Sequence, residues 1–491
     1  MGMIAVENVI DYGVDNSGGG DPTTNTEGIQ RALDEAESNG GGIVYFPVGK
    51  YLINETLKLP SKVKILGEGG TTFGFLQHEI GTSNFLNFPS TIIIMDDDSN
   101  VNMLEPKGLP PLQYGANNNI LYQAEIENLI LFGNKENQTR GDGIHLSDIT
   151  NNSYSTRGHV RFRNILIYQF YGNGFYGGIG HHELYFDEVV VFGCDSDGVI
   201  LYGQDTKVNR LQSADNGGTG IKILGKKDDT KPALHASGAI RLYDIDCWSN
   251  AKGIEIIDTL NVFFYGLGCN LNTIGVHIHP GITQEGWSPL QIHFFRANFD
   301  ANTECDVKVS SSAPNLGSAN ILFESCLFRG KEVVPPQTPP DYAIVDESYI
   351  PARNIVSNCF FRRDLYGIGI INNNGIYTFR DCFDYNSRRV LDEITVPYSY
   401  VDYDYTILPT DGYITVGTAT GNITITLPKL SDTQVGKVLF LSKVDSHSNS
   451  VTIIPDTWTN DIIQGATTIN QQFETLMVVN AGAAWYSVKI S

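Results

Sequence analysis

A short motif built around a glycine recurs five times in the middle of the chain: Asn173-Gly174-Phe175, Asp197-Gly198-Val199-Ile200, Thr219-Gly220-Ile221-Lys222, Lys252-Gly253-Ile254-Glu255 and Ile274-Gly275-Val276-His277. Its glycines are 24, 22, 33 and 22 residues apart, and the long step contains a charged, turn-rich insertion at residues 226–237. A period near 22 residues is typical of one coil of a three-strand parallel β-helix, whose coils bury their apolar side chains only by stacking. The repeat therefore predicts an all-β protein, a parallel β-helix of about ten coils.

Five of the seven cysteines follow the same period. Cys247 and Cys269 are 22 residues apart, Cys359 and Cys382 are 23 apart, and Cys326 joins the second pair if the Pro-rich stretch 331–341 is a loop. Positions one period apart in a β-helix form a ladder with rungs about 4.8 Å apart. Because no C-x-x-C pair is present, the pattern favours an internal stack of free thiols over a disulfide framework, a zinc site or a catalytic cysteine.

Composition and charge exclude several classes of function. The net charge is −22, and no basic stretch interleaved with aromatic residues offsets it, so we exclude nucleic acid as a partner. The sequence holds no apolar run of about 18 residues, so we expect no contact with a membrane. Residues 1–15 lack the basic and apolar regions of a Sec signal peptide. If the protein works outside cells, we therefore expect it to leave by lysis, by another route or as part of a virion.

The two ends of the chain differ from the repeat. Thr24-Asn25-Thr26-Glu27 predicts a capping box, and the apolar face that follows predicts a helix covering the open end of the coils. We expect this cap and the first coil over residues 1–70, the β-helix over 71–392 and a linker over 393–402. From residue 403 to 491 the period is lost, and short β-branched segments predict a separate antiparallel β-sandwich.

The opening of the chain resembles the entry segment of the pectate-lyase-like superfamily of right-handed β-helices. Asp11-Tyr12-Gly13, the capped helix and the segment 40–51 (GGGIVYFPVGKY) match that entry, and residues 63–69 (VKILGEG) resemble its first coil. Phage tailspikes and polysaccharide depolymerases share this opening. Residues 421–486 resemble the trimerisation or glycan-binding domains that end many phage tail proteins. The resemblance implies a homotrimeric depolymerase acting on a bacterial capsule, exopolysaccharide or teichoic-type polymer.

A carboxylate pair is the first candidate for the chemistry. Glycosidic hydrolysis uses two carboxyl groups, about 5 Å apart for retention and about 6.5–9.5 Å apart for inversion. Asp244 and Asp246 are expected to point outward from one strand, at about 6.6 Å, with Tyr243, Ile245 and Cys247 in the opposite phase. The matching positions of the next two coils are Gly266 and Gly268, then Arg296 and Asn298. Two glycines between carboxylates and an arginine predict a notch for a sugar; the alternative is a surface salt bridge.

A second candidate lies two residues past the marker glycines, where Lys222, Glu255 and His277 occupy one ladder and His279 follows. A glutamate between lysine and histidine suits acid–base catalysis or substrate binding. Opposite charges stacked on an exposed sheet face are also ordinary cross-strand pairs. The sequence leaves both interpretations open.

Turn residues supply a third candidate: Asp195, Asp197 and Asp215, with Trp248 expected to match Asp215 one coil later as a sugar-stacking platform. The segment Cys194–Gly198 faintly resembles the Asn-Thr-Asp-Gly segment of polygalacturonases, although the double-Asp and Arg-x-Lys motifs that accompany it there are missing. Aspartates are also ordinary turn formers, and an Asp-rich turn suits Ca²⁺.

Neither a cofactor nor a catalytic metal is expected, because His181-His182 and His277-x-His279 lack a third ligand at suitable spacing in the sequence. Within enzymes, the rival to hydrolysis is β-elimination from a uronate, with Lys222, Arg241 or Arg296 as the proton acceptor. A non-catalytic adhesin or receptor-binding spike is the alternative from another class, since stacked sheets with exposed Tyr and Trp bind glycans without cutting them.

Overall fold

The computed structural model describes residues 5–69, 89–108, 121–147, 156–178, 181–202, 205–225, 239–257, 259, 261–279, 290–310, 319–331, 339–347, 353–362, 365–366, 369–373, 376–384, 389–391, 398–407, 411–433, 435–456 and 461–490. The insertion 226–237 and most of the stretch 331–341 lie outside these residues. The chain divides into two compact units, Met1–Gly375 with Arg380–Leu391, and Ile376–Phe379 with Asp392–Ser491. No helix in the described part of the chain is both long and apolar enough to span a bilayer.

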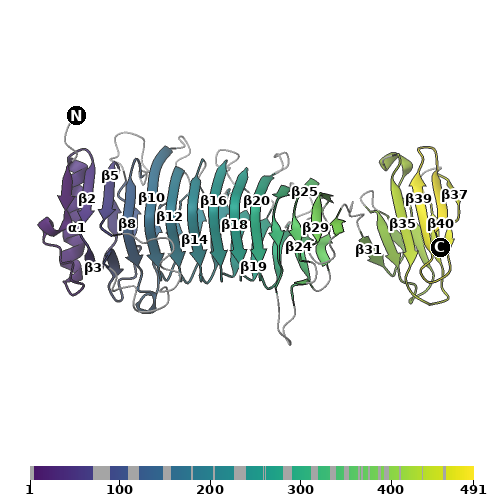
Figure 1. The fold of residues 1–491 in the computed structure, drawn as a ribbon, viewed down its shortest axis with the longest axis horizontal. Helices are drawn as coiled ribbons and strands as arrows, with labels where there is room; N and C mark the ends of the chain where they lie inside the picture. Colours follow the sequence, from purple (N-terminus) through teal and green to yellow (C-terminus); the bar gives the residue numbers. More distant parts are fainter. Residues whose placement is uncertain are drawn as a thin grey trace. The chain divides into compact units, whose positions relative to one another are not determined.

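The first unit is a parallel β-helix, as the repeat predicted (Figure 1). Two long sheets form it, and we call them sheet A and sheet B. Within the described residues sheet A has 19 strands. They are β1 (Val6–Asn8), β2 (Gly42–Phe46), β3 (Gly49–Ile53), β5 (Val63–Gly67), β6 (Thr91–Met95), β8 (Glu125–Phe132), β10 (Thr156–Tyr168), β12 (His181–Phe192), β14 (Lys207–Ala214), β16 (Ile240–Trp248), β18 (Val262–Asn270), β20 (Leu290–Asp300), β22 (Ala319–Glu324), β23 (Leu327–Phe328), β25 (Arg353–Ser357), β26 (Phe360–Phe361), β28 (Ile376–Arg380), β29 (Cys382–Asp384) and β30 (Arg389–Leu391).

Sheet B has 11 strands in the described part of the chain, each joined to the strand of the next coil in parallel register. They are β4 (Leu57–Leu59), β7 (Leu104–Pro106), β9 (Ile144–His145), β11 (Phe175–Tyr176), β13 (Val199–Leu201), β15 (Thr219–Leu224), β17 (Lys252–Ile257), β19 (Ile274–His279), β21 (Cys305–Ser310), β24 (Tyr342–Glu347) and β27 (Gly369–Asn373).

Each central coil turns twice at single residues of positive φ. The long strands of sheet A bend once, for example at Arg210 in β14, Asp244 in β16 and Arg296 in β20, with φ of 52°, 51° and 55°. A second corner follows the strand, as at Asp215 and Ser249, with φ of 55° and 56°. The left-handed conformation turns the chain sharply within one residue, so one sheet A strand supplies two faces of the coil.

The five marker glycines stack directly above one another, as their spacing predicted. A Cβ atom on Gly198 would lie 2.6 Å from the carbonyl oxygen of Gly220, and one on Gly220 would lie 2.7 Å from that of Gly253. Such distances are too short for any side chain, so the glycines are fixed by the close approach of successive coils. The motif at residues 173–277 therefore marks the entry of each chain segment into sheet B.

Internal ladders fill the space between the sheets. Cys247 lies opposite Cys269, and all seven cysteines are free and buried, which confirms the thiol stack. Below the second corner runs a ladder of asparagines: the side-chain amide of Asn216 donates to Asn250 at 3.0 Å, and that of Asn250 donates to Asn272 at 3.2 Å. These bonds satisfy buried polar groups at a turn where the sheet ladder is interrupted.

The helix α1 (Pro22–Ser38) covers the first coils, and its apolar residues Ile29, Ala32, Leu33 and Ala36 are buried as predicted. Its N-cap is Asp21, which accepts from the backbone N–H of Thr24, and not Thr24 itself. Pro22 at the first helical position accounts for this earlier start, since proline is pre-set for that place. Short 3₁₀ helices lie at η1 (Val9–Tyr12), η4 (Lys135–Asn137) and η6 (Leu430–Asp432).

The second unit packs two sheets around a core that includes Trp485. Sheet C contains β31 (Tyr398–Val401), β33 (Tyr413–Val416), β35 (Val438–Lys443), β37 (Ile463–Gly465), β39 (Thr475–Asn480) and β40 (Trp485–Ile490). Sheet D contains β32 (Tyr405–Thr406), β34 (Ile423–Thr426), β36 (Val451–Ile454) and β38 (Thr468–Ile469).

The expected antiparallel pairing of this unit needs correction. Strands β31, β33 and β35 pair in parallel, as do β32, β34 and β36, because the chain alternates between the two sheets. Antiparallel pairing is found from β35 to β39, from β39 to β40 and from β36 to β38. Strand β31 also lies within residues 393–402, which the sequence had suggested as a linker.

Candidate functional site

The carboxylate pair lies on sheet A in the register that the glycine spacing predicted. Asp246 in β16 is opposite Gly268 in β18, which is opposite Asn298 in β20. Asp244 leans over Gly266 in the same way: a Cβ on Gly266 would lie 2.9 Å from Oδ1 of Asp244. The two glycines therefore leave room for the carboxylates themselves, and not only for a ligand.

The alternation expected on β16, which puts Leu242 with the two aspartates on the outward face and Tyr243 on the inward face, was wrong at both Leu242 and Tyr243. Leu242, Ile245 and Cys247 are buried, whereas Tyr243 is 37% exposed. The cause is the left-handed conformation of Asp244, which breaks the two-residue alternation of a strand. The estimate of about 6.6 Å between the two carboxyl groups holds for a straight strand and does not apply across this bend.

The surroundings of Asp246 raise the pKa of its carboxyl group. Burial raises its pKa, the negative charge of Asp244 raises it further, and a hydrogen bond from the buried Gln212 opposes both effects. Asp244 is exposed at the corner. A half-buried acid next to an exposed carboxylate has the arrangement that a general acid and its partner require.

Polar groups without partners surround Asp246. In the described residues, the side-chain oxygens of Asn270 and Asn298 are buried and accept no hydrogen bond. Trp248 is half-buried on the same arm of β16 and lies opposite Asn270. Buried acceptors of this kind are unusual in folded proteins, and sugar hydroxyl groups are donors that would satisfy them.

Aromatic rings line the neighbouring row of sheet A. Tyr243, Tyr265 and Phe295 stack on one another with ring centroids 4.9 and 5.1 Å apart. Arg296 follows Phe295 at the corner and is exposed. This aromatic row lies before the corner of its strands, and Trp248 lies after the corner of β16. Aromatic side chains therefore flank the two carboxylates in both directions along the strand.

The second candidate forms a compact cluster on sheet B. Lys222, Glu255 and His277 lie in one register row, as predicted, but Glu255 is only 5% exposed and His277 only 8%. Glu255 accepts from His279 Nε2 at 3.1 Å, lies 3.3 Å from Lys222 Nζ and contacts Lys252 Nζ. The row is therefore a buried ion network and not an exposed ladder.

The neighbours of Glu255 and His277 in this cluster shift the pKa of both side chains. Burial opposes ionisation of Glu255, but the hydrogen bonds from His279 and Lys252 outweigh burial and lower its pKa. Burial lowers the pKa of His277 to about 3, and the neighbouring His279 and Lys252 act in the same direction. His277 is thus neutral at physiological pH while Glu255 is charged.

The third group of candidates has structural partners. Asp197 accepts from the backbone N–H of Thr219 at 2.7 Å and pairs with Lys222 at 3.2 Å. Asp195 pairs with Lys135 at 2.7 Å, and Asp215 is an exposed corner residue. Trp248 lies opposite Ala214 and not opposite Asp215, because the turn from this strand to the marker glycine is one residue shorter after β16 than after β14. These aspartates are turn residues and do not meet at one site.

One cluster was missed in the sequence. His145 Nδ1 lies 2.6 Å from Asp142 Oδ2, and its ring stacks on Tyr176 at 4.6 Å. His145 is in the same sheet B row as Tyr176 and, further along, Lys222 and Glu255. The segment Asp142-Gly143-Ile144-His145 is a further copy of the marker motif, so aligning it with Gly275-Val276-His277 would have found it.

Comparison with known proteins places this fold. Residues 6–233 match the family described as rhamnogalacturonase A/epimerase, pectate lyase-like, and no curated protein matches the sequence. Among solved structures, the A-module of mannuronan C-5 epimerase AlgE4 from Azotobacter vinelandii is 18% identical, with a TM-score of 0.51 over 76% of this chain and 99% of that one. The exopolygalacturonase of Thermotoga maritima is 11% identical, with a TM-score of 0.48 over 79% and 94%. Tailspike protein 2 of bacteriophage CBA120 is 10% identical, with a TM-score of 0.44 over 81% and 48%.

At these identities the likeness to solved structures concerns the fold. The coil period, the parallel sheets, the capped first coil and the matched family agree with one another. The chain folds as a parallel β-helix, and residues 6–233 of it match a pectate-lyase-like family.

Proposed function

We propose that this protein is a glycoside hydrolase that cleaves a bacterial surface polysaccharide, with Asp246 as general acid and Asp244 as its carboxylate partner. The observation that carries the proposal is the half-buried Asp246, whose pKa is raised by burial and by the charge of Asp244. A carboxylic acid with a raised pKa beside a second carboxyl group is an arrangement that glycosidic cleavage uses.

The surroundings of the pair support a sugar ligand. Asn270 and Asn298 offer buried side-chain oxygens without donors, and Trp248 supplies an apolar ring of the kind that packs against sugar rings. Arg296 is exposed at the corner above Gly266 and would meet an acidic group of the polymer. The family matched by residues 6–233 is described by a rhamnogalacturonase and an epimerase, which supports a polysaccharide as the substrate class.

In this mechanism Asp246 donates its proton to the glycosidic oxygen as the bond to the leaving sugar breaks. Asp244 either takes a proton from the water that attacks the anomeric carbon, which gives inversion, or attacks that carbon itself. In the second case water, deprotonated by Asp246, breaks the new bond between Asp244 and the sugar, which gives retention. The anomer first released from the polymer distinguishes inversion from retention.

The test is the release of reducing ends from a panel of bacterial capsule, exopolysaccharide and teichoic-type polymers. Asp246→Asn is expected to lose at least about 100-fold in activity, within the range for a general acid. Asp187→Asn removes an exposed carboxylate of the same sheet that pairs with Arg210 and is the matched control, with activity unchanged. Full activity of Asp246→Asn would contradict the proposal, as would binding of a polymer that no preparation cleaves.

We also propose that the protein acts as a homotrimer of a virion tail or of the extracellular space. The support is an apolar row on the last strand: Tyr486, Val488 and Ile490 in β40 are exposed although the chain is strongly acidic. Exposed apolar rows of this kind mark surfaces that pack against another chain. A mass in solution of three times the 54.0 kDa chain is expected. A monomer at micromolar concentration would contradict the proposed trimer and would leave the proposal of hydrolysis unaffected.

A further inference from the structure

A second site can be argued on sheet B from Glu255, His277 and His279. Each residue contributes one potential ligand atom, and these three atoms lie within 4.8 Å of one another. Two imidazoles and one carboxylate are a common ligand set for zinc and related divalent transition ions. We propose that these three residues bind a Zn²⁺-type ion, at a site separate from the carboxylates of sheet A.

The distances fit a single ion. The nitrogens that face the carboxylate are His279 Nε2, 3.1 Å from Glu255 Oε1, and His277 Nδ1, 3.9 Å from the same oxygen. Ligands about 2.0–2.1 Å from a tetrahedral zinc ion lie about 3.3 Å from each other. The observed pair of distances brackets that value, so small rotations of the side chains would close the site.

The second nitrogen of each ring, Nε2 of His277 and Nδ1 of His279, lies within hydrogen-bond distance of the same hydroxyl oxygen. Ser310 Oγ lies 2.8 Å from His277 Nε2 and 3.3 Å from His279 Nδ1. Metal-binding histidines usually have their second nitrogen fixed in this way, which orients the ring and selects the tautomer. Ser310 in β21 therefore acts as a positioning residue that turns the remaining nitrogen of each ring toward Glu255.

His277 supplies independent support. Its Nδ1 is buried and makes no hydrogen bond within the described residues, although the side chain is only 10% exposed. A buried polar atom without a partner costs free energy, and an ion placed between it and Glu255 would remove that cost. The sheet alone gives no reason for a histidine to point there.

Two lysines compete with the ion for Glu255. Lys252 Nζ contacts Oε1, the oxygen that faces both histidines, whereas Lys222 Nζ lies on Oε2 and is also held by Asp197. Lys252 is 30% exposed and can rotate into solvent. The proposal thus makes an unusual prediction: removal of this cationic side chain strengthens the binding of a cation.

The experiment is a calorimetric titration of the untagged, chelator-treated full chain with Zn²⁺. One ion per chain is expected for the wild type. Glu255→Gln and His279→Ala are expected to abolish this binding, and Ser310→Ala is expected to weaken it about 10- to 100-fold. His447→Ala removes an exposed histidine of the second unit and should change nothing; Lys252→Met should tighten binding.

Three results would overturn the site. The first is a wild type that binds no Zn²⁺ in the micromolar range. The second is binding that survives in Glu255→Gln and His279→Ala, because the ion would then be elsewhere. The third is equal or weaker binding in Lys252→Met. Circular dichroism and melting curves of each variant exclude misfolding, and because the readout is the ion itself, the result does not depend on the proposed hydrolysis.

Discussion

Gly268 lies directly against the carboxylate of Asp246: a Cβ built on the glycine would be 2.3 Å from Asp246 Oδ1. The two residues are register partners on adjacent strands of sheet A. Because the nearest atom is the end of a flexible side chain, a methyl group at this position moves the carboxylate and leaves the backbone where it is. The position of the proposed general acid thus depends on having glycine, with no side chain, at residue 268 in the next coil.

Gly268→Ala is therefore expected to reduce kcat more than about 10-fold, while the free energy of unfolding changes by less than about 1 kcal/mol. Steady-state kinetics and denaturant titration measure the two effects. Gly266→Ala is the contrasting variant, because Gly266 has a φ of 80° and alanine there adds backbone strain. A Gly268→Ala variant with normal activity would show that the place of the Asp246 carboxylate is unimportant.

The role of Asp246 predicts a dependence on the leaving group. An aryl glycoside of the identified sugar carries a leaving group that needs no proton, so Asp246→Asn should cleave it nearly as well as the wild type and fail only on the polymer. With the polymer, wild-type kcat/KM should fall as pH rises through the raised pKa of Asp246, because the acid loses its proton. Equal losses on both substrates would assign Asp246 to another role.

Asp306 predicts a pH dependence of stability. This carboxyl is fully buried, where it accepts from Asn302 at 2.8 Å and from Tyr366 at 2.5 Å. Burial raises its pKa to about 6 against these bonds, so the folded state binds the proton more tightly than the unfolded state. Its contribution to the free energy of unfolding should therefore decrease by about 3 kcal/mol as pH rises from about 4 to about 7.

Denaturation at several pH values checks this sign. The stability of the wild type relative to Asp306→Asn should fall across that window, whereas Asp187→Asn, which removes a partly exposed carboxylate paired with Arg210, should show no such trend. A difference that stays flat, or that grows with pH, would mean that Asp306 is ionised in the folded protein throughout.

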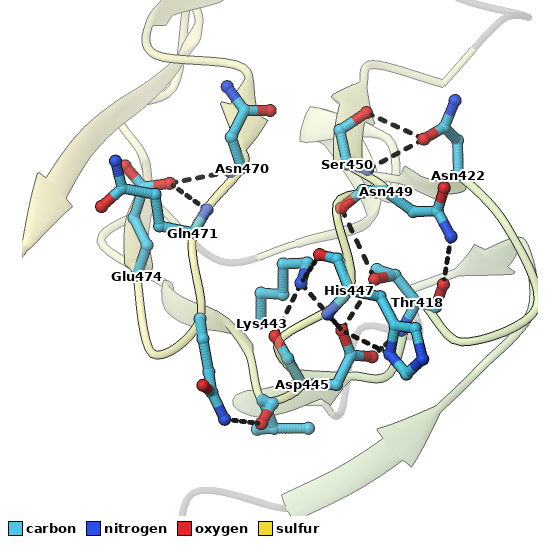
Figure 2. Close-up of polar contacts among 12 residues, drawn as sticks. Thr418, Asn422, Lys443, Asp445, His447, Asn449, Ser450, Asn470, Gln471 and Glu474 are labelled. Atoms are coloured by element: carbon cyan, nitrogen blue, oxygen red, sulfur yellow. Dashed lines mark hydrogen bonds and ion pairs between the residues drawn. The ribbon is translucent and has the colours of Figure 1, made fainter.

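In the second unit, Lys443 is fully buried and its ammonium group is held by a single turn (Figure 2). It donates to the carbonyl oxygens of Asp445 and His447 and to Asp445 Oδ1, all within 2.8 Å. Asp445 also accepts from the hydroxyl of Thr418 at 2.9 Å. Lys443→Met removes the donor that these three acceptors share and leaves the partly buried charge of Asp445 without its cation, so the second unit should lose about 3 kcal/mol.

Differential scanning calorimetry measures this loss. Lys489→Met is the matched control, because Lys489 pairs with Glu474 on the surface and such pairs contribute less than about 1 kcal/mol. Equal effects of the two substitutions would show that the buried ammonium group is not what fixes the turn.

Much of the β-helix could be predicted from the sequence, because the coil period is constant where no insertion interrupts it. The rows Asp246–Gly268–Asn298 and Lys222–Glu255–His277 followed from the glycine spacing alone. The shift of Trp248 by one residue arose in the turn after β16, which is one residue shorter than the turn after β14, so the step between marker glycines does not apply to the preceding strand.

The conformation and burial of the site could not be predicted in the same way. The corners of sheet A are occupied by residues as different as Arg210 and Asp244, so no residue type marks the bend that exposes Tyr243. Glu255 and His277 were expected on an exposed face, and their burial depends on the lysines and on Ser310, which come from several coils. The parallel pairing of β31 to β36 leaves the same alternating pattern as antiparallel strands, so the sequence did not distinguish them.

The most direct test of the central claim starts from the polymer that the protein is found to cleave. This polymer is digested in water enriched in ¹⁸O, and the products are analysed by mass spectrometry. Hydrolysis through Asp246 predicts one ¹⁸O atom at each new reducing end with the wild type, and almost no product with Asp246→Asn. Unlabelled products that carry an unsaturated uronate would instead establish elimination, and would contradict the assignment of Asp246 as the general acid of a hydrolase.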